Sequence, residues 1–254
     1  MSKFDSKIYE RDIYEDSMYS AWLKYSNERD ILEEVLKKNK DLWVKKNSIS
    51  ILEFGCGTGS AAKRIFNILN SEGISYEYTG VDPYQDQLDR WSEWLPKGQK
   101  VSLVKGTIED FRSSEKYDLV LAVHSLYYVN DIGEALRSIK NFGKNAIIVH
   151  HGMKGINEVH EAFRSFVKLG PNIISTYKEV KQELDAEQIP YFFEVAMSRV
   201  DIRACQNPNN EDGKKLIKFF LEHSELSEKI IVEVRTFLRT KGDFMEQYVG
   251  YFFL

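Results

Sequence analysis

The chain has 254 residues, a length typical of one large α/β domain with insertions. Hydrophobic residues make up 43% of the chain and charged residues 29%, a balance that supplies a packed core and argues against intrinsic disorder. The net charge is −4 and no basic run occurs, which argues against a large nucleic-acid-binding surface.

The first predicted element is a helix over residues 16–38. Its apolar residues recur on one face and are Met18, Trp22, Tyr25, Ile31, Leu32, Val35 and Leu36. Two interpretations are open, a helix packed on the core and a lid over a ligand site. One helix can serve as both.

Three glycines at alternate positions, Gly55, Gly57 and Gly59, separate a β-branched run from a helical pattern. The run at 49–54 predicts a strand, and apolar spacings of three and four predict a helix over about 59–72. Glycine permits a positive φ and a close approach of the backbone to a ligand. Because the loop and the helix N-terminus follow the carboxyl end of a strand, this stretch predicts a ligand site.

A second signal is Asp82, which ends the next predicted strand over residues 76–82. A carboxylate at the tip of the second strand can accept hydrogen bonds from both hydroxyls of a ribose. Pro83 stops this strand, an amphipathic helix is expected over 85–95, and residues 101–105 are the third predicted strand.

Residues 117–123 form a near-continuous apolar run, which is typical of a buried central strand. A helix over 132–142 and a strand over 145–151 are expected next. This alternation predicts an α/β fold with a parallel sheet and helices on both faces. Later segments are expected to be helices at 157–168, 176–188, 212–221 and 227–239, with strands at 192–202 and 248–254. The terminal strand is expected to be antiparallel, at or near one edge of the sheet.

The glycine stretch is preceded by an acid, Glu53, and its spacing differs from the dinucleotide fingerprint G-x-G-x-x-G. The run from Glu53 to Gly59 resembles motif I of the class I S-adenosylmethionine (SAM) methyltransferases. Three segments resemble the histamine N-methyltransferase family more narrowly: residues 20–28, 124–132 and 200–213. They are similar to that family's N-terminal substrate helix, its L-Y-Y-V-x-D-I segment and its D-I…N-E-N-G stretch.

The resemblance implies a Rossmann-like, seven-stranded, mostly parallel sheet with an antiparallel C-terminal strand, in a single domain over residues 1–254. Within it, residues 1–45 are expected to form an N-terminal helical lid and 205–245 a helical insertion before the last strand. The implied cofactor contacts are Glu53, Gly55, Gly57, Gly59, Asp82, Gln87, Thr107, Ile108 and His124. Thr107 stands where the family commonly has an acidic residue, so backbone groups near Ile108 are expected to take over the adenine contact.

For the substrate, the resemblance implies that Glu28 binds an amine. His124 stands where the family has a glutamine, and Glu246 aligns with an asparagine, so histamine itself does not follow as the substrate. An amine remains the expected acceptor, and His124, Glu28 and Glu246 are the catalytic candidates, because a carboxylate or an imidazole can take the proton of an amine.

Other polar and aromatic residues rank lower. His150 and His151 end a strand at the same edge and rank below His124, and Tyr127 and Tyr128 are interpreted as packing. The histidines and cysteines lack metal-ligand spacing, so no metal site is expected.

The expected activity is therefore SAM-dependent methyl transfer to a small molecule, a cationic amine. Two alternatives are a small-molecule O-methyltransferase and a non-catalytic module that keeps the SAM fold. We expect a cytoplasmic protein without membrane or nucleic-acid partners. The N-terminus is polar, the two cysteines form no disulfide pattern, and no apolar run reaches 18 residues. The protein is expected to be a monomer or a weak homodimer.

Overall fold

The structure is a computed structural model that describes residues 17–96, 98–167 and 174–254. These residues form two compact units. The sheet unit contains residues 29–150, 177–196 and 249–254. Within the described ranges, the helical unit contains residues 17–28, 151–167, 174–176 and 197–248.

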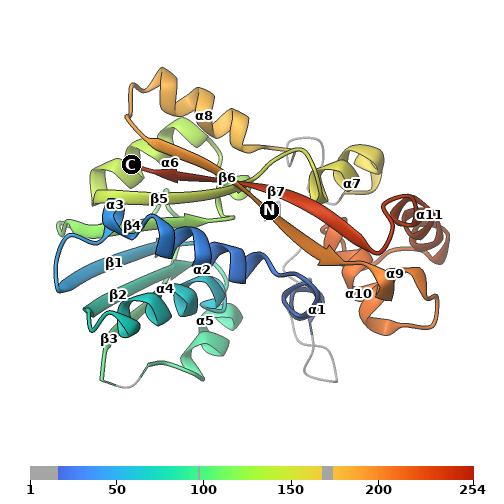
Figure 1. Cartoon of the computed structure of the whole chain (residues 1–254), viewed down its shortest axis with the longest axis horizontal. Coiled ribbons are helices and arrows are strands. Elements are labelled where there is room, and N and C mark those ends of the chain that lie inside the picture. Colours follow the sequence, from blue (N-terminus) through green and yellow to red (C-terminus); the bar gives the residue numbers. More distant parts are fainter. Residues whose placement is uncertain (1–16, 97, 168–173) are drawn as a thin grey trace. The chain divides into compact units, whose positions relative to one another are not determined.

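A seven-stranded sheet has the strand order β3-β2-β1-β4-β5-β7-β6 (Figure 1). Its strands are β1 (Ser48–Phe54), β2 (Ser75–Asp82), β3 (Lys100–Lys105), β4 (Tyr117–Val123), β5 (Gly143–His151), β6 (Phe192–Asp201) and β7 (Phe244–Phe253). The first five strands pair in parallel. Ala146 and Leu254 exchange backbone hydrogen bonds of 3.0 and 2.9 Å, as antiparallel neighbours do. The predicted mostly parallel sheet with an antiparallel C-terminal strand is confirmed. β7 begins four residues before the predicted strand, because its alternation of buried and more exposed side chains continues through 244–247.

Helices pack on both faces of the sheet unit, as predicted. They are α2 (Glu28–Lys38), α3 (Lys40–Trp43), α4 (Ser60–Ser71), α5 (Gln85–Ser92), α6 (Ile132–Phe142), α8 (Tyr177–Ala186) and the 3₁₀ turn η2 (Leu126–Tyr128). Alternate residues of one strand enter two different cores: Leu119 packs with residues of α2 and α4, whereas Val120 packs with residues of α6 and α8. This division follows from the period of two along a strand.

The helical unit has a hydrophobic core of its own, which includes Trp22, Val159, Leu216, Phe220 and Val234. Its helices are α1 (Met18–Tyr25), α7 (Ile156–Ala162), α9 (Arg203–Gln206), α10 (Glu211–Phe220), α11 (Glu228–Arg239) and the 3₁₀ turn η3 (Arg164–Phe166). The predicted helical insertion at 205–245 belongs to this unit. The predicted lid at 1–45 is divided, since 17–28 belong to the helical unit and 29–45 to the sheet unit. Its residues 1–16 lie outside the described residues, and lid function stays a prediction.

The single helix predicted over 16–38 is wrong, because the chain forms two helices, α1 and α2, with a break at Ser26 and Asn27. Ser26 makes an antiparallel bridge to Val200. The Asn27 N–H donates to the Arg199 carbonyl at 3.1 Å, and its side-chain oxygen accepts from the Arg199 N–H at 2.7 Å. Pairing with β6 thus replaces helical hydrogen bonds at this point, and Glu28 becomes the first residue of α2.

Other boundaries differ by a few residues. α5 ends at Ser92 rather than at 95, and the helix predicted over 157–168 ends at Ala162, is followed by η3, and has its last predicted residue outside the described ranges. Among the described helices, none is long and apolar enough to cross a membrane.

Candidate active site

The glycine loop of the sheet unit connects β1 to α4 and is tied to the end of β2. The N–H groups of Gly55 and Cys56 donate to the Val81 carbonyl at 2.8 and 3.2 Å. Gly55, Gly57 and Gly59 have φ values of 69°, 53° and 76°, in the left-handed region that favours glycine. The loop conformation therefore depends on all three glycines.

The three glycines have different surroundings. A Cβ at Gly55 would lie 2.4 Å from Ser125 Cβ, and one at Gly59 would lie 1.5 Å from Trp91 Nε1. At Gly57, no heavy atom of the described residues lies within 4 Å of the corresponding position. Gly55 and Gly59 thus permit close packing within the protein. Gly57 borders open space at the carboxyl end of the sheet, where a ligand can approach the backbone.

Asp82, at the tip of β2, is held by the same loop. One carboxylate oxygen accepts from the Gly57 N–H at 2.8 Å and the other from the Tyr84 N–H at 3.0 Å. Burial raises the pKa of Asp82 to about 6, although these two hydrogen bonds lower it. A ligand that donates to this carboxylate would replace part of the solvation that it has lost.

Glu53, at the end of β1, is 1% exposed and accepts a hydrogen bond from the Tyr78 hydroxyl. Burial raises the pKa of Glu53 to about 7, while the Tyr78 hydroxyl and the charge of Arg29 act to lower it. Arg29 also donates from Nε to Ser60 Oγ at 3.2 Å, at the start of α4. The strand that leads into the glycine loop therefore ends with a buried acid of raised pKa, Glu53, and the Arg29 guanidinium contacts the start of the helix that follows the loop.

The other predicted cofactor contacts lie in the same unit. Gln87 is buried in α5, and Ile108 is buried after β3 in the same core as Val81. The Thr107 hydroxyl lies 3.0 Å from a carboxylate oxygen of Asp110 and accepts from the Asp110 N–H. Thr107 thus shapes the turn after β3. Contact of these three residues with a cofactor stays a prediction.

His124 follows β4 and has an unusual backbone conformation, with a φ of 55°. Its N–H donates to the Val149 carbonyl at 2.9 Å, and its Nδ1 lies 3.3 Å from the Tyr127 hydroxyl. The Tyr127 ring stacks on His150 with centroids 4.0 Å apart. The sequence prediction placed Tyr127 in packing alone, but the structure joins it to His124.

Glu28 lies in the helical unit and is 2% exposed. A carboxylate oxygen of Glu28 lies 2.8 Å from His151 Nε2 and accepts from the Gln247 amide. The Gln247 oxygen accepts from the Ile156 N–H at 3.4 Å, so the amide nitrogen faces Glu28 and His151. A carboxylate, an imidazole and an amide thus share one buried site within this unit.

Gln247 is a residue that the sequence reasoning missed. It is completely buried, and it stands one position after Glu246, where the resemblance suggested an amide. Neighbouring residues on a strand point to opposite faces, so Glu246 and Gln247 diverge. The structure therefore brings Gln247, and not Glu246, to Glu28. Its amide side chain directly after Glu246 in the terminal strand was the available signal.

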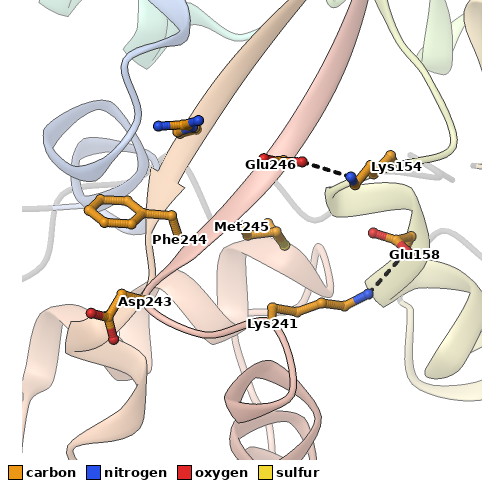
Figure 2. A pocket seen from close by; sticks show the side chains of 8 residues that line it. Lys154, Glu158, Lys241, Asp243, Phe244, Met245 and Glu246 are labelled. Carbon is orange, nitrogen blue, oxygen red and sulfur yellow. Dashed lines mark hydrogen bonds and ion pairs between the residues drawn. The ribbon is translucent and has the colours of Figure 1, made fainter.

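Glu246 lines a separate groove of the helical unit, with a volume of about 430 Å³ (Figure 2). It forms an ion pair of 2.7 Å with Lys154, and a second pair of 3.0 Å joins Lys241 to Glu158. Ion pairing with Lys154 lowers the pKa of Glu246. A role for Glu246 in substrate binding stays a prediction.

Comparison with known proteins identifies a match to the family model described as a methyltransferase domain, over residues 52–146. This range contains the glycine loop, Asp82 and His124. Histamine N-methyltransferase of Bos taurus is 23% identical over 228 residues, which cover 80% of this chain and 78% of the relative. A ubiquinone biosynthesis O-methyltransferase of Rickettsia bellii is 25% identical over 109 residues, 42% of this chain and 43% of the relative.

Other relatives are much larger. The chain spans 2% of a polyketide synthase-nonribosomal peptide synthetase of Aspergillus flavipes and 6% of a polyketide synthase of Aspergillus terreus. Among solved structures, the plantazolicin methyltransferase BpumL in complex with S-adenosylhomocysteine (SAH) has a TM-score of 0.57 at 17% identity. The match covers 99% of this chain and 94% of BpumL. The likeness supports the same fold.

Proposed function

We propose that the chain is a SAM-dependent methyltransferase and that it methylates an amine nitrogen of a small molecule. SAM is its cofactor, and the glycine loop fits this ligand. Gly57 leaves room for it, and Asp82 offers carboxylate oxygens for ribose hydroxyls. When bound, SAM supplies a methyl group that is already activated by a sulfonium. The protein has to bind and orient the acceptor, exclude water, and remove a proton.

The buried carboxylate of Glu28 is the observation that carries the amine proposal. A carboxylate removed from water favours a cationic partner, and a hydrogen bond between two charged groups is roughly twice as strong as a neutral one. Glu28 would bind the substrate as an ammonium ion, with Gln247 and His151 holding the carboxylate in place. As a separate part of the proposal, His124 of the sheet unit is the candidate acceptor for the proton that a substrate nitrogen loses before it attacks.

The experiment is a panel of small amines, phenols and carboxylic acids with methyl-labelled SAM, followed by mass location of the methyl group. Glu28→Gln should raise KM for the best amine and leave SAH affinity unchanged, because it removes a binding interaction outside the glycine loop. Glu246→Gln makes the same chemical change at the other acidic candidate, which is 37% exposed and paired with Lys154, so the pair of variants shows which acid binds the amine.

O-methylation is the second candidate, and the ubiquinone biosynthesis relative favours it. A neutral phenol would gain no ion pair from the Glu28 charge, and a carboxylate would be repelled by it. Faster turnover of an acidic substrate by Glu28→Gln would replace the amine proposal with O-methylation.

A further inference from the structure

We propose that Tyr127 is a positioning residue, whose hydroxyl group holds the His124 imidazole in the tautomer that can accept a proton. The inference rests on the proposed role of His124 as proton acceptor, and it holds for methylation of either nitrogen or oxygen. All of the groups that carry it belong to the sheet unit.

The backbone of His124 is fixed in a conformation that costs energy. A left-handed conformation is unfavourable for a residue other than glycine, because its Cβ approaches the following carbonyl oxygen. Here it is maintained by the bond from the His124 N–H to Val149 on β5. The next residue, Ser125, lies against Gly55, where a side chain would collide with it. His124 is therefore locked to the glycine loop on one side and to β5 on the other.

The imidazole ring is fixed as well. Its Nδ1 lies 3.3 Å from the Tyr127 hydroxyl, and the two ring planes are 3° from parallel. The Tyr127 ring in turn stacks on His150, which is buried on β5. Tyr127 thus has one face held by packing while its hydroxyl reaches His124.

The direction of this contact sets the tautomer, because the Tyr127 hydroxyl can either accept from Nδ1–H or donate to an unprotonated Nδ1. A neutral imidazole has one nitrogen that donates and one that accepts. If the Tyr127 oxygen accepts from Nδ1–H, the lone pair is on Nε2, which can then take a proton from the acceptor substrate. In that step a substrate N–H or O–H bond breaks, an Nε2–H bond forms, and the imidazolium keeps its Nδ1–H bond to Tyr127. With the opposite tautomer, Nε2 already carries a proton and cannot act as a base.

The neighbouring Tyr128 supplies a matched control. It belongs to the same 3₁₀ turn, η2, but is 41% exposed. Tyr127→Phe removes only the hydroxyl and keeps a ring that can stack on His150, and Tyr128→Phe makes the same chemical change one position later.

The test is nitrogen NMR of histidine-labelled full-length protein bound to SAH, together with methyl transfer to histamine as the probe amine. The wild type should show His124 as the Nδ1–H tautomer, and Tyr127→Phe should shift it toward Nε2–H, whereas Tyr128→Phe should not. SAH affinity should stay within about twofold in both variants, and kcat should fall roughly tenfold in Tyr127→Phe alone.

The NMR readout needs no substrate, so it separates this inference from the proposed function. A wild-type His124 in the Nε2–H form would overturn the positioning role, as would an identical tautomer in Tyr127→Phe. If the tautomer shifts but no amine, phenol or acid in the panel is methylated, the positioning role stands and the assignment of the substrate fails.

Discussion

We expect the variant Gly57→Ala to fold and yet to bind the cofactor weakly. The change Gly57→Ala places a methyl group where no atom of the described residues lies within 4 Å, at a φ of 53°. The cost to the folded state is therefore the left-handed backbone alone, roughly 1–2 kcal/mol. Native domains have about 5–15 kcal/mol of stability, so this variant should fold.

Cofactor affinity should respond differently. The new methyl group occupies the open space beside the Gly57 backbone, which a ligand bound at the glycine loop would need. We expect SAH affinity to fall at least tenfold, which is about 1.4 kcal/mol. Calorimetric titration with SAH measures the affinity, and urea unfolding measures the stability.

Gly73→Ala is the matched control for this experiment. Gly73 also has a positive φ, 68°, and also lacks neighbours within 4 Å among the described residues, but it lies between α4 and β2. It should lose the same stability as Gly57→Ala and keep wild-type SAH affinity. Equal SAH affinity in the two variants would refute the assignment of the Gly57 space to the cofactor.

Three other outcomes are expected. Asp82→Asn should weaken SAH binding by on the order of 1.5–3 kcal/mol in calorimetry, as expected for loss of a charged acceptor, and unchanged affinity would remove Asp82 from the ribose site. Because burial raises the pKa of Glu53 from 4.5 to about 7, the folded state binds the extra proton, so the stabilisation is complete below pH 4.5 and is lost as the pH rises through 7. Between pH 5 and 8, urea unfolding of ligand-free protein should show that Glu53→Gln loses on the order of 3 kcal/mol less stability than the wild type, because other shifted groups such as Asp82 titrate in both proteins. In amine kinetics, KM should rise at least tenfold in Glu28→Gln and change less than twofold in Glu246→Gln, and the reverse order would move the amine to the Glu246 groove.

Local sequence patterns predicted the strand–loop–helix around Gly57 and the position of Asp82, because both follow from residues adjacent in the chain. The alternation of strands and helices likewise predicted the parallel part of the sheet. The break at Ser26 could not be predicted in this way, since it depends on pairing with Val200 in a distant strand.

The polar contacts of Glu28 could not be predicted from the sequence for a similar reason. Glu28 itself came from a resemblance, but His151 and Gln247 reach it from β5 and β7, and their direction depends on strand register. A register error of one residue exchanges Gln247 for Glu246 and reverses the face that each side chain occupies. Tyr127 and Tyr128 were equally indistinguishable in sequence, and only the direction of the turn η2 separates them.

The position of β7 between β5 and β6 has a consequence for biosynthesis. The ribosome makes β6 before β7, yet β7 is the neighbour of β6 in the order of the described strands. Until β7 emerges, the nascent chain carries β6 without this neighbour, and with apolar side chains such as Phe192 and Val195, which stay partly exposed even in the folded protein. Such a strand can pair with other chains, so this protein should depend on chaperones late in translation, and a chain stopped before Phe244 should aggregate rather than fold.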